Sequence, residues 1–205
     1  MCEYYTNLSE YFLGTWSRGR AKPFSFTQHQ RARLGIKGRL GEADRKVASQ
    51  PLVYLDKDGF LSRFNLRKFS ELPCHLIRAK RFSDLFSELL FNYSWLHAKL
   101  SSTPLERIIQ DFQESYEALS CPEDKRQVLM VQDTLKLGGA ILSKIPDMLA
   151  GQLVGRLLPE MWRSPGVEKL IRECDQLSPS HNSLIPVCHS LLSPGGPMKF
   201  SLEVR

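Results

Sequence analysis

The chain has 205 residues, of which 42% are apolar and 24% are charged, and its formal net charge is +6. This composition is ordinary for a soluble globular protein, and the apolar runs stay well below the roughly 20 residues that a membrane-spanning helix requires, which excludes a membrane protein. Because the first residues also lack a signal peptide, we expect one large or two small domains in the cytoplasm, with the nucleus as the alternative.

The first predicted element is the end of an amphipathic helix. The stretch Leu8–Trp16 carries apolar residues at helical spacing and stops at Gly14, a residue type that commonly ends helices. Its apolar partners are missing upstream, so we expect the tail of a larger domain.

The positive charge of the chain is confined to the segment that follows. Residues 18–46 hold nine Lys or Arg against two acidic residues, hence +7, whereas the rest of the chain carries 19 basic and 20 acidic residues, hence −1. Because the stretch Ser17–Gln50 is rich in glycine and has weak apolar periodicity, we expect a flexible basic loop.

Two interpretations of the basic loop stay open. It is either a solvated surface loop, or an arm that binds the phosphates of nucleic acid or an anionic surface through Arg18–Lys46. The second interpretation has few aromatic rings for base stacking, since Phe24 and Phe26 are the only candidates in the segment. The candidate basic surface consists of Arg31, Arg33, Lys37 and Arg39.

A small β-hairpin is predicted over about Leu52–Phe64. Two short apolar runs flank Asp56-Lys57-Asp58-Gly59, and Gly59 can adopt the positive φ that a tight turn needs. The same four residues are typical of the start of a calcium-binding loop, but the glutamate that closes such a loop is absent. We therefore prefer a turn.

From Phe69 onward the apolar residues recur at helical spacing. The clearest part is Leu72–Asp111, where Trp95 and Phe91 widen the apolar stripe and the residues between, Lys99 among them, are expected on a polar opposite face. A stripe this wide favours helices packed on two sides, as in a bundle or solenoid. The stripe comprises Phe82, Leu85, Phe86, Leu89, Leu90, Tyr93, Leu96 and Leu100.

Proline and glycine punctuate this helical region and the tail after it. Pro73 predicts a helix start, and Gly151 and Gly155, one turn apart, predict close helix packing. We predict a mainly α fold, a helical bundle or short α-solenoid with the small hairpin and the basic loop. We predict three divisions of the chain: residues 1–68, a helical region 69–177 and a tail 178–205. The expected packing or interaction anchors in the core are Trp16, Trp95 and Trp162.

Motifs for chemistry are missing from the sequence. There is no G-x-x-x-x-G-K-[ST] phosphate loop, no G-x-S-x-G elbow and no H-E-x-x-H pair, and the five histidines have no partner at a spacing typical of a triad. A metal site would have to use Cys174, His181, Cys188 and His189, which lack the usual ligand spacing. We therefore expect no enzyme, no cofactor and no metal.

Four stretches of the helical region follow one another in a set order: Phe69–Leu76, Leu85–Leu90, Trp95–Leu100 and Ile108–Phe112. Together they resemble the helical arm of signal-transduction NTPases of the NACHT or apoptosome type. The arm's signature, L-P-x-H-L, an apolar helix, W-L-x-A-K-L and a D-[YF] helix, is present in this order. Within that group the chain is most similar to the NACHT and WD-repeat proteins, in which a nucleotide-binding domain and a winged helix precede the arm and WD repeats follow it.

The resemblance implies a winged-helix tail, the helical arm and the opening of a first WD repeat, without the nucleotide-binding domain. No phosphate or magnesium site of the family can therefore be carried over to this chain. What it implies is a non-enzymatic helical linker and protein-interaction module in a signalling scaffold. Its expected partners are proteins, either neighbouring domains or other chains, with nucleic acid as the alternative and no membrane.

Overall fold

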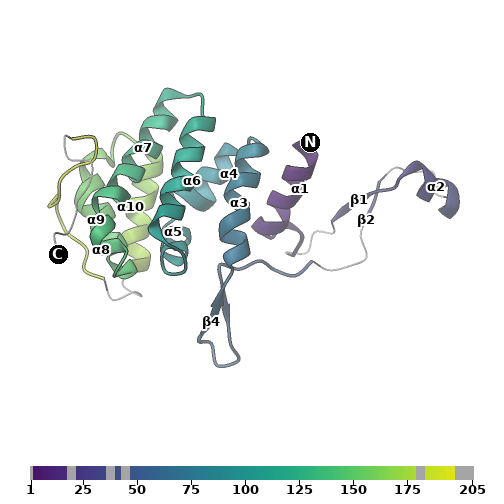
Figure 1. Cartoon of the computed structure of the whole chain (residues 1–205), viewed down its shortest axis with the longest axis horizontal. Coiled ribbons are helices and arrows are strands. Elements are labelled where there is room, and N and C mark those ends of the chain that lie inside the picture. The colour runs from purple at the N-terminus through teal and green to yellow at the C-terminus, as the bar shows by residue number, and fades with distance from the viewer. Residues whose placement is uncertain (1, 18–21, 36–39, 43–46, 179–182, 197–205) are drawn as a thin grey trace.

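The computed structural model describes residues 2–17, 22–35, 40–42, 47–178 and 183–196 (Figure 1). The chain opens with α1 (Cys2–Leu13) and η1 (Thr15–Ser17). Gly14 between them has a φ of +79°, so the predicted helix end at this glycine is confirmed. The phenyl ring of Phe12 is fully buried where α1 packs against α3 (Leu66–Arg78).

The basic segment contains more regular structure than a loop. Its described residues form β1 (Pro23–Ser25), α2 (Gln28–Leu34) and β2 (Leu40–Glu42), and β1 pairs antiparallel with β2. The sequence carried a signal for α2, because Thr27 and Gln30 form a capping box in which each backbone N–H donates to the other residue's side-chain oxygen. We call the described residues of this segment, 22–35 and 40–42, the basic arm. In Figure 1 the basic arm extends away from the row of helices, which we call the helical body.

The predicted β-hairpin is confirmed. Strands β3 (Val53–Leu55) and β4 (Leu61–Phe64) pair antiparallel, and Gly59 in the turn has a φ of +84°. One Asp56 carboxylate oxygen accepts hydrogen bonds from the backbone N–H groups of Asp58 and Phe60, both at 2.9 Å. This carboxylate therefore closes the turn, as the turn interpretation required.

The rest of the molecule is a row of short helices around one core, which confirms the predicted mainly α fold (Figure 1). The core cluster is continuous from Phe12 on α1 to Cys174 on the last helix. After α3 the elements are α4 (Phe82–Leu85), the wide helical turn η2 (Phe86–Leu90), α5 (Tyr93–Leu100), α6 (Leu105–Ala118), α7 (Pro122–Leu137), α8 (Gly139–Leu142), η3 (Pro146–Met148), α9 (Leu149–Leu157), η4 (Leu158–Glu160) and α10 (Pro165–Leu177).

Two expectations about glycine and proline are wrong in detail. Pro73 lies inside α3, which begins seven residues earlier, where the Asn65 side chain accepts a hydrogen bond from the backbone N–H of Lys68. Gly151 and Gly155 do allow a close approach, but to the extended chain after α10: the N–H of Leu191 donates to the Gly155 carbonyl at 3.0 Å. The division of the chain at residues 68 and 177 stays a prediction.

Candidate interaction site

Lys99 is the most unusual residue of the helical body. It was expected on a polar face, but it is only 2% exposed and lies where α3, α5 and α6 meet. Its ammonium donates to the Phe69 carbonyl oxygen at 2.7 Å, pairs with the Asp111 carboxylate, and lies 6.0 Å from the centroid of the Trp95 ring. One side chain of α5 therefore ties together the two neighbouring helices.

Pro73 explains why the Phe69 carbonyl is available to Lys99. In an α-helix this carbonyl would accept from the backbone N–H of residue 73, but proline has no N–H. The missing bond would leave a buried acceptor unsatisfied, and the Lys99 ammonium takes the place of the missing donor. The proline inside α3 thus leaves free the carbonyl group to which the buried lysine of α5 donates.

Asp111 completes this arrangement, which we call the helix clamp: Phe69, Pro73, Trp95, Lys99 and Asp111. Burial raises the pKa of Asp111 to about 6, and the attraction of the Lys99 ammonium opposes that rise. The edge of one aromatic ring meets the face of the other where Phe69 packs against Trp95, with the ring centroids 5.0 Å apart. The clamp fixes α3, α5 and α6 relative to one another.

A groove opens beside the helix clamp, between α3 and α6. Its volume is about 850 Å³, within the range of about 300–1,000 Å³ that is usual for binding sites. Leu66, which is 54% exposed, lies along it, and Lys99 and Asp111 contribute to its lining. We call it the α3–α6 groove; the other lining residues are Arg67, Phe69, Ser70, Cys74, Ile77, Arg78, Ser102, Thr103, Pro104, Arg107, Gln110 and Glu114.

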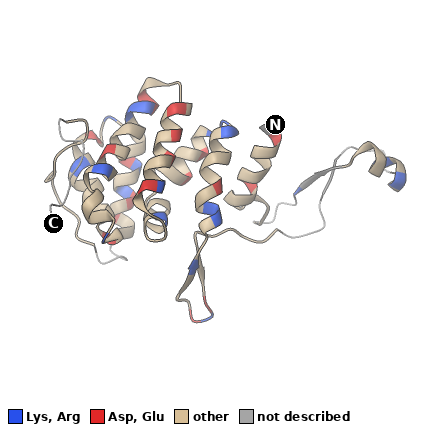
Figure 2. Cartoon of the chain, viewed as in Figure 1, with Lys and Arg blue, Asp and Glu red and all other residues tan. Residues whose placement is uncertain are grey.

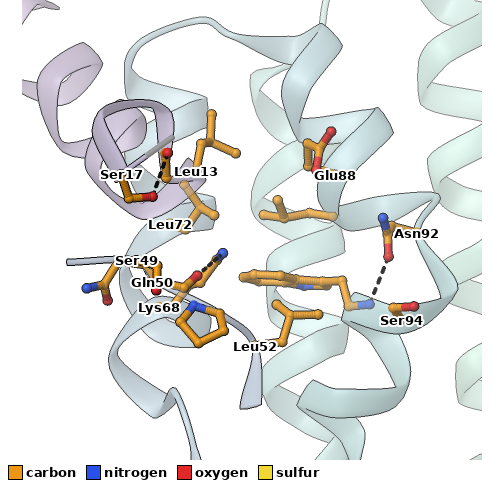
Figure 3. Close-up of a pocket in the computed structure, with 14 residues that line it drawn as sticks. Leu13, Ser17, Ser49, Gln50, Leu52, Lys68, Leu72, Glu88, Asn92 and Ser94 are labelled. Atoms are coloured by element: carbon orange, nitrogen blue, oxygen red, sulfur yellow. Dashed lines mark hydrogen bonds between the residues drawn. The ribbon is translucent and has the colours of Figure 1, made fainter. Parts of the chain in front are cut away.

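A smaller pocket of about 370 Å³ lies on the side of α3 that faces α1 (Figure 3). Figure 3 shows Lys68 and Gln50 on one side and Asn92 and Ser94 on the other. The Lys68 ammonium donates to the Gln50 carbonyl at 2.6 Å, and the Asn92 side chain accepts from the backbone N–H of Trp95 at 2.9 Å. The Lys68 ammonium therefore holds the loop before β3, and the Asn92 side chain caps the start of α5.

The three tryptophans do not share one environment. Trp16 and Trp95 are buried, at 8% and 2% exposure, as expected of core anchors. Trp162 is 80% exposed, so the expectation that it anchors the core is wrong; it lies in the turn between η4 and α10 instead of on a packed helix face. Whether any of the three contacts a partner stays a prediction.

The predicted basic surface is only partly described. Arg31 and Arg33 lie on α2, away from the α3–α6 groove, and Figure 2 shows basic but no acidic residues on this helix. Lys37 and Arg39 lie outside the described residues. The structure therefore brings neither of the two described arginines to the helix clamp.

The described residues contain neither a cluster of metal ligands nor a helix suited to cross a membrane. In the described part of the chain no three His, Cys, Asp or Glu side chains gather as metal ligands. Of the four residues considered for a metal, Cys174 is buried, Cys188 is exposed and His181 falls outside the described ranges. No helix among the described residues is long and apolar enough to cross a membrane.

The helix clamp could be predicted only in part from the sequence. Its residues come from three signature stretches, but a lysine between apolar residues looks like a solvent-facing position. A usable signal was the spacing of four between Trp95 and Lys99, which places both on one side of the helix. The α3–α6 groove had no signal, because its two walls lie about 40 residues apart in the chain.

Comparisons with known proteins agree with this architecture. Residues 56–153, which contain the helix clamp and both walls of the groove, match the family of the APAF-1 helical domain. Human NACHT and WD repeat domain-containing protein 2 is 28% identical over 92% of this chain, and mouse NACHT domain- and WD repeat-containing protein 1 is 30% identical over 95% of it. No solved structure matches the chain significantly.

The chain spans only 11% and 12% of the length of these two relatives. The similarity therefore concerns one part of much longer proteins. Residues 56–153 match the APAF-1 helical domain, and nearly the whole chain is similar to one part of the NACHT and WD repeat domain-containing proteins.

Proposed function

We propose that this chain is a non-enzymatic helical module that holds protein domains together and binds a protein segment in the α3–α6 groove. The observation that carries the proposal is the position of that groove, open beside three helices that the helix clamp fixes. A rigid frame beside an open groove favours binding, because little conformational entropy is lost when a partner docks.

The surface chemistry of the groove supports a protein as the ligand. Exposed Leu66 and the half-buried Ile77 offer apolar contact on α3, while Ser70 and Gln110 offer hydrogen bonds. Exposed apolar side chains among groups that can form hydrogen bonds are typical of protein interfaces. The partner we propose is a neighbouring domain or another chain of a cytoplasmic signalling scaffold.

The absence of enzymatic activity is part of the proposal. The charged groups deepest in the groove, Lys99 and Asp111, are paired with each other, and Lys99 also satisfies a backbone carbonyl. Groups committed to packing in this way are poorly suited to transfer protons to a substrate. We expect the purified chain to hydrolyse neither ATP nor GTP, and turnover that increases with the concentration of the chain and survives repeated purification would contradict this.

A binding experiment tests the proposed role of the groove. The NACHT and WD-repeat parts of the human relative, prepared as separate polypeptides, are titrated with this chain, and we expect a complex with at least one of them. Ser70→Trp fills the α3–α6 groove and should weaken the complex tenfold or more. Glu117→Trp on the exposed side of α6 is the matched control. Equal binding by both variants, or no complex with either polypeptide, would contradict the proposal.

A further inference from the structure

A second groove, of about 350 Å³, lies where the basic arm joins the helical body. We call it the α1 groove, and its walls come from α1, η1, the start of the arm and α3. Tyr4, Tyr11 and Trp16 supply aromatic rings to it, and Lys22 and Arg67 supply positive charge. Its lining is mainly apolar with cations at its border, unlike the mixed charges of the α3–α6 groove.

The aromatic side chains of the α1 groove differ in the fraction that is exposed to solvent. Tyr4 is 63% exposed, Tyr11 is half-buried, and Trp16 is buried with the Lys22 ammonium 4.9 Å from its ring centroid. The buried tryptophan holds the lysine beside the groove by a cation–π contact. The Tyr4 ring meets the Tyr5 ring edge to face, with the ring centroids 5.5 Å apart, and it is the most exposed of the three rings. It is therefore the ring that is available to stack on a flat aromatic ligand.

The charge around the α1 groove favours an anion. Lys22 lies at the start of the basic arm, and α2 farther along the arm adds Arg31 and Arg33. The Arg67 guanidinium donates to Glu71 at 2.8 Å, yet its side chain is 70% exposed and still reaches the groove. A ligand that extends from the groove along the arm would meet successive cations.

We propose that the α1 groove and the basic arm bind single-stranded nucleic acid, with a base stacked on Tyr4 and the adjoining phosphates bound by Lys22 and Arg67. This activity is additional to the protein contacts of the α3–α6 groove. Single strands fit because their bases are free to stack on aromatic side chains, whereas the bases of a duplex are stacked on one another. An acidic protein or a membrane surface would match the charge, but neither needs an exposed tyrosine ring beside it.

The test compares two strands with the same number of phosphates. A fluorescein-labelled oligouridine of about 12 nucleotides, enough to cover one binding site, and an abasic strand of equal length are titrated with the whole chain at two salt concentrations, and anisotropy is recorded. We expect affinity to fall steeply with salt, because phosphate contacts release counterions. We also expect the oligouridine to bind at least fivefold more tightly than the abasic strand, because only it can stack.

Two variants separate stacking from charge. Tyr4→Ala should abolish the preference for the strand with bases but keep the salt dependence, whereas Lys22→Ala should weaken both strands and lower the salt slope by about 1. Phe60→Ala and Lys57→Ala change an exposed ring and an exposed cation on the β3–β4 turn, outside the α1 groove, and serve as matched controls.

Three outcomes would overturn the proposal. The first is an absence of binding at low salt. The second is equal affinity for the oligouridine and the abasic strand, which would assign the arm to polyanions in general. The third is binding to phosphatidylserine vesicles that is tighter than binding to the oligouridine and unaffected by Tyr4→Ala, which would assign it to membranes.

Discussion

Lys99 shows at the scale of one residue how a buried charge can organise this fold. Its ammonium has two oxygen partners, one on α3 and one on α6, so its removal leaves both without a donor. We expect Lys99→Met to lower the free energy of unfolding at pH 7 by about 3–5 kcal/mol, the usual effect of breaking a buried ion pair. Urea denaturation measures this, and Lys57→Met in the exposed turn should change it by less than about 0.5 kcal/mol. Similar losses in both variants would contradict a structural role for Lys99.

Asp111 gives a second prediction at this scale, on pH. Its pKa is about 6 in the folded chain and about 3.9 in an unfolded chain, so between these values the folded state binds more protons. Its contribution to stability is therefore complete below about pH 4 and is lost as pH rises through about 6, by up to about 3 kcal/mol.

The measurement is the free energy of unfolding of the wild type and of Asp111→Asn, at about pH 4.5 and about pH 7.5, on either side of the folded-state pKa. Because the amide of the variant cannot ionise, the difference between the two proteins should shift in favour of the variant at the higher pH. In Lys99→Met the dependence should be steeper, since the attraction that opposes the pKa rise is gone. Parallel pH profiles for all three proteins would show that Asp111 does not titrate differently in the folded state.

At the scale of elements, the packing of α10 on the turn after η2 leaves no space for an added side chain. A Cβ atom at Gly166 would lie 2.8 Å from the Phe91 ring, and the ring is buried and cannot move aside. We expect Gly166→Ala to lower the free energy of unfolding by about 1–3 kcal/mol, the usual cost of overpacking. At Gly139 a Cβ atom would meet only Leu105 at 3.5 Å, an ordinary contact, so Gly139→Ala should be neutral or slightly stabilising. The reverse order of the two variants in thermal unfolding would contradict this description.

Elements whose signals are local could be predicted from the sequence, and those set by distant contacts could not. The β3–β4 hairpin was predictable because the Asp56–Gly59 turn carries its own chemistry. The break at Phe91-Asn92 was not located, because a capping asparagine looks like any polar residue in an amphipathic stripe. The α2 helix was missed for lack of apolar periodicity, although its capping box was present.

At the scale of the whole molecule, helical periodicity and composition were sufficient for the fold class but not for the sites. The row of helices follows from an apolar stripe that needs cover on two sides. The α3–α6 groove, the α1 groove and the buried position of Lys99 depend on how helices far apart in sequence meet, and no single stretch encodes that. Burial of Trp95 and exposure of Trp162 differ for the same reason.

The central claim is that the α3–α6 groove is a surface for protein contact. We would test it first by placing a photocrosslinking amino acid at Ser70 in the groove, or at Glu117 outside it, in the complex with the NACHT or WD-repeat polypeptide. Mass spectrometry of the products should locate crosslinks from position 70 to one continuous segment of the partner and few from position 117. Crosslinks from position 117 alone, or from neither position in a complex that forms, would contradict the claim.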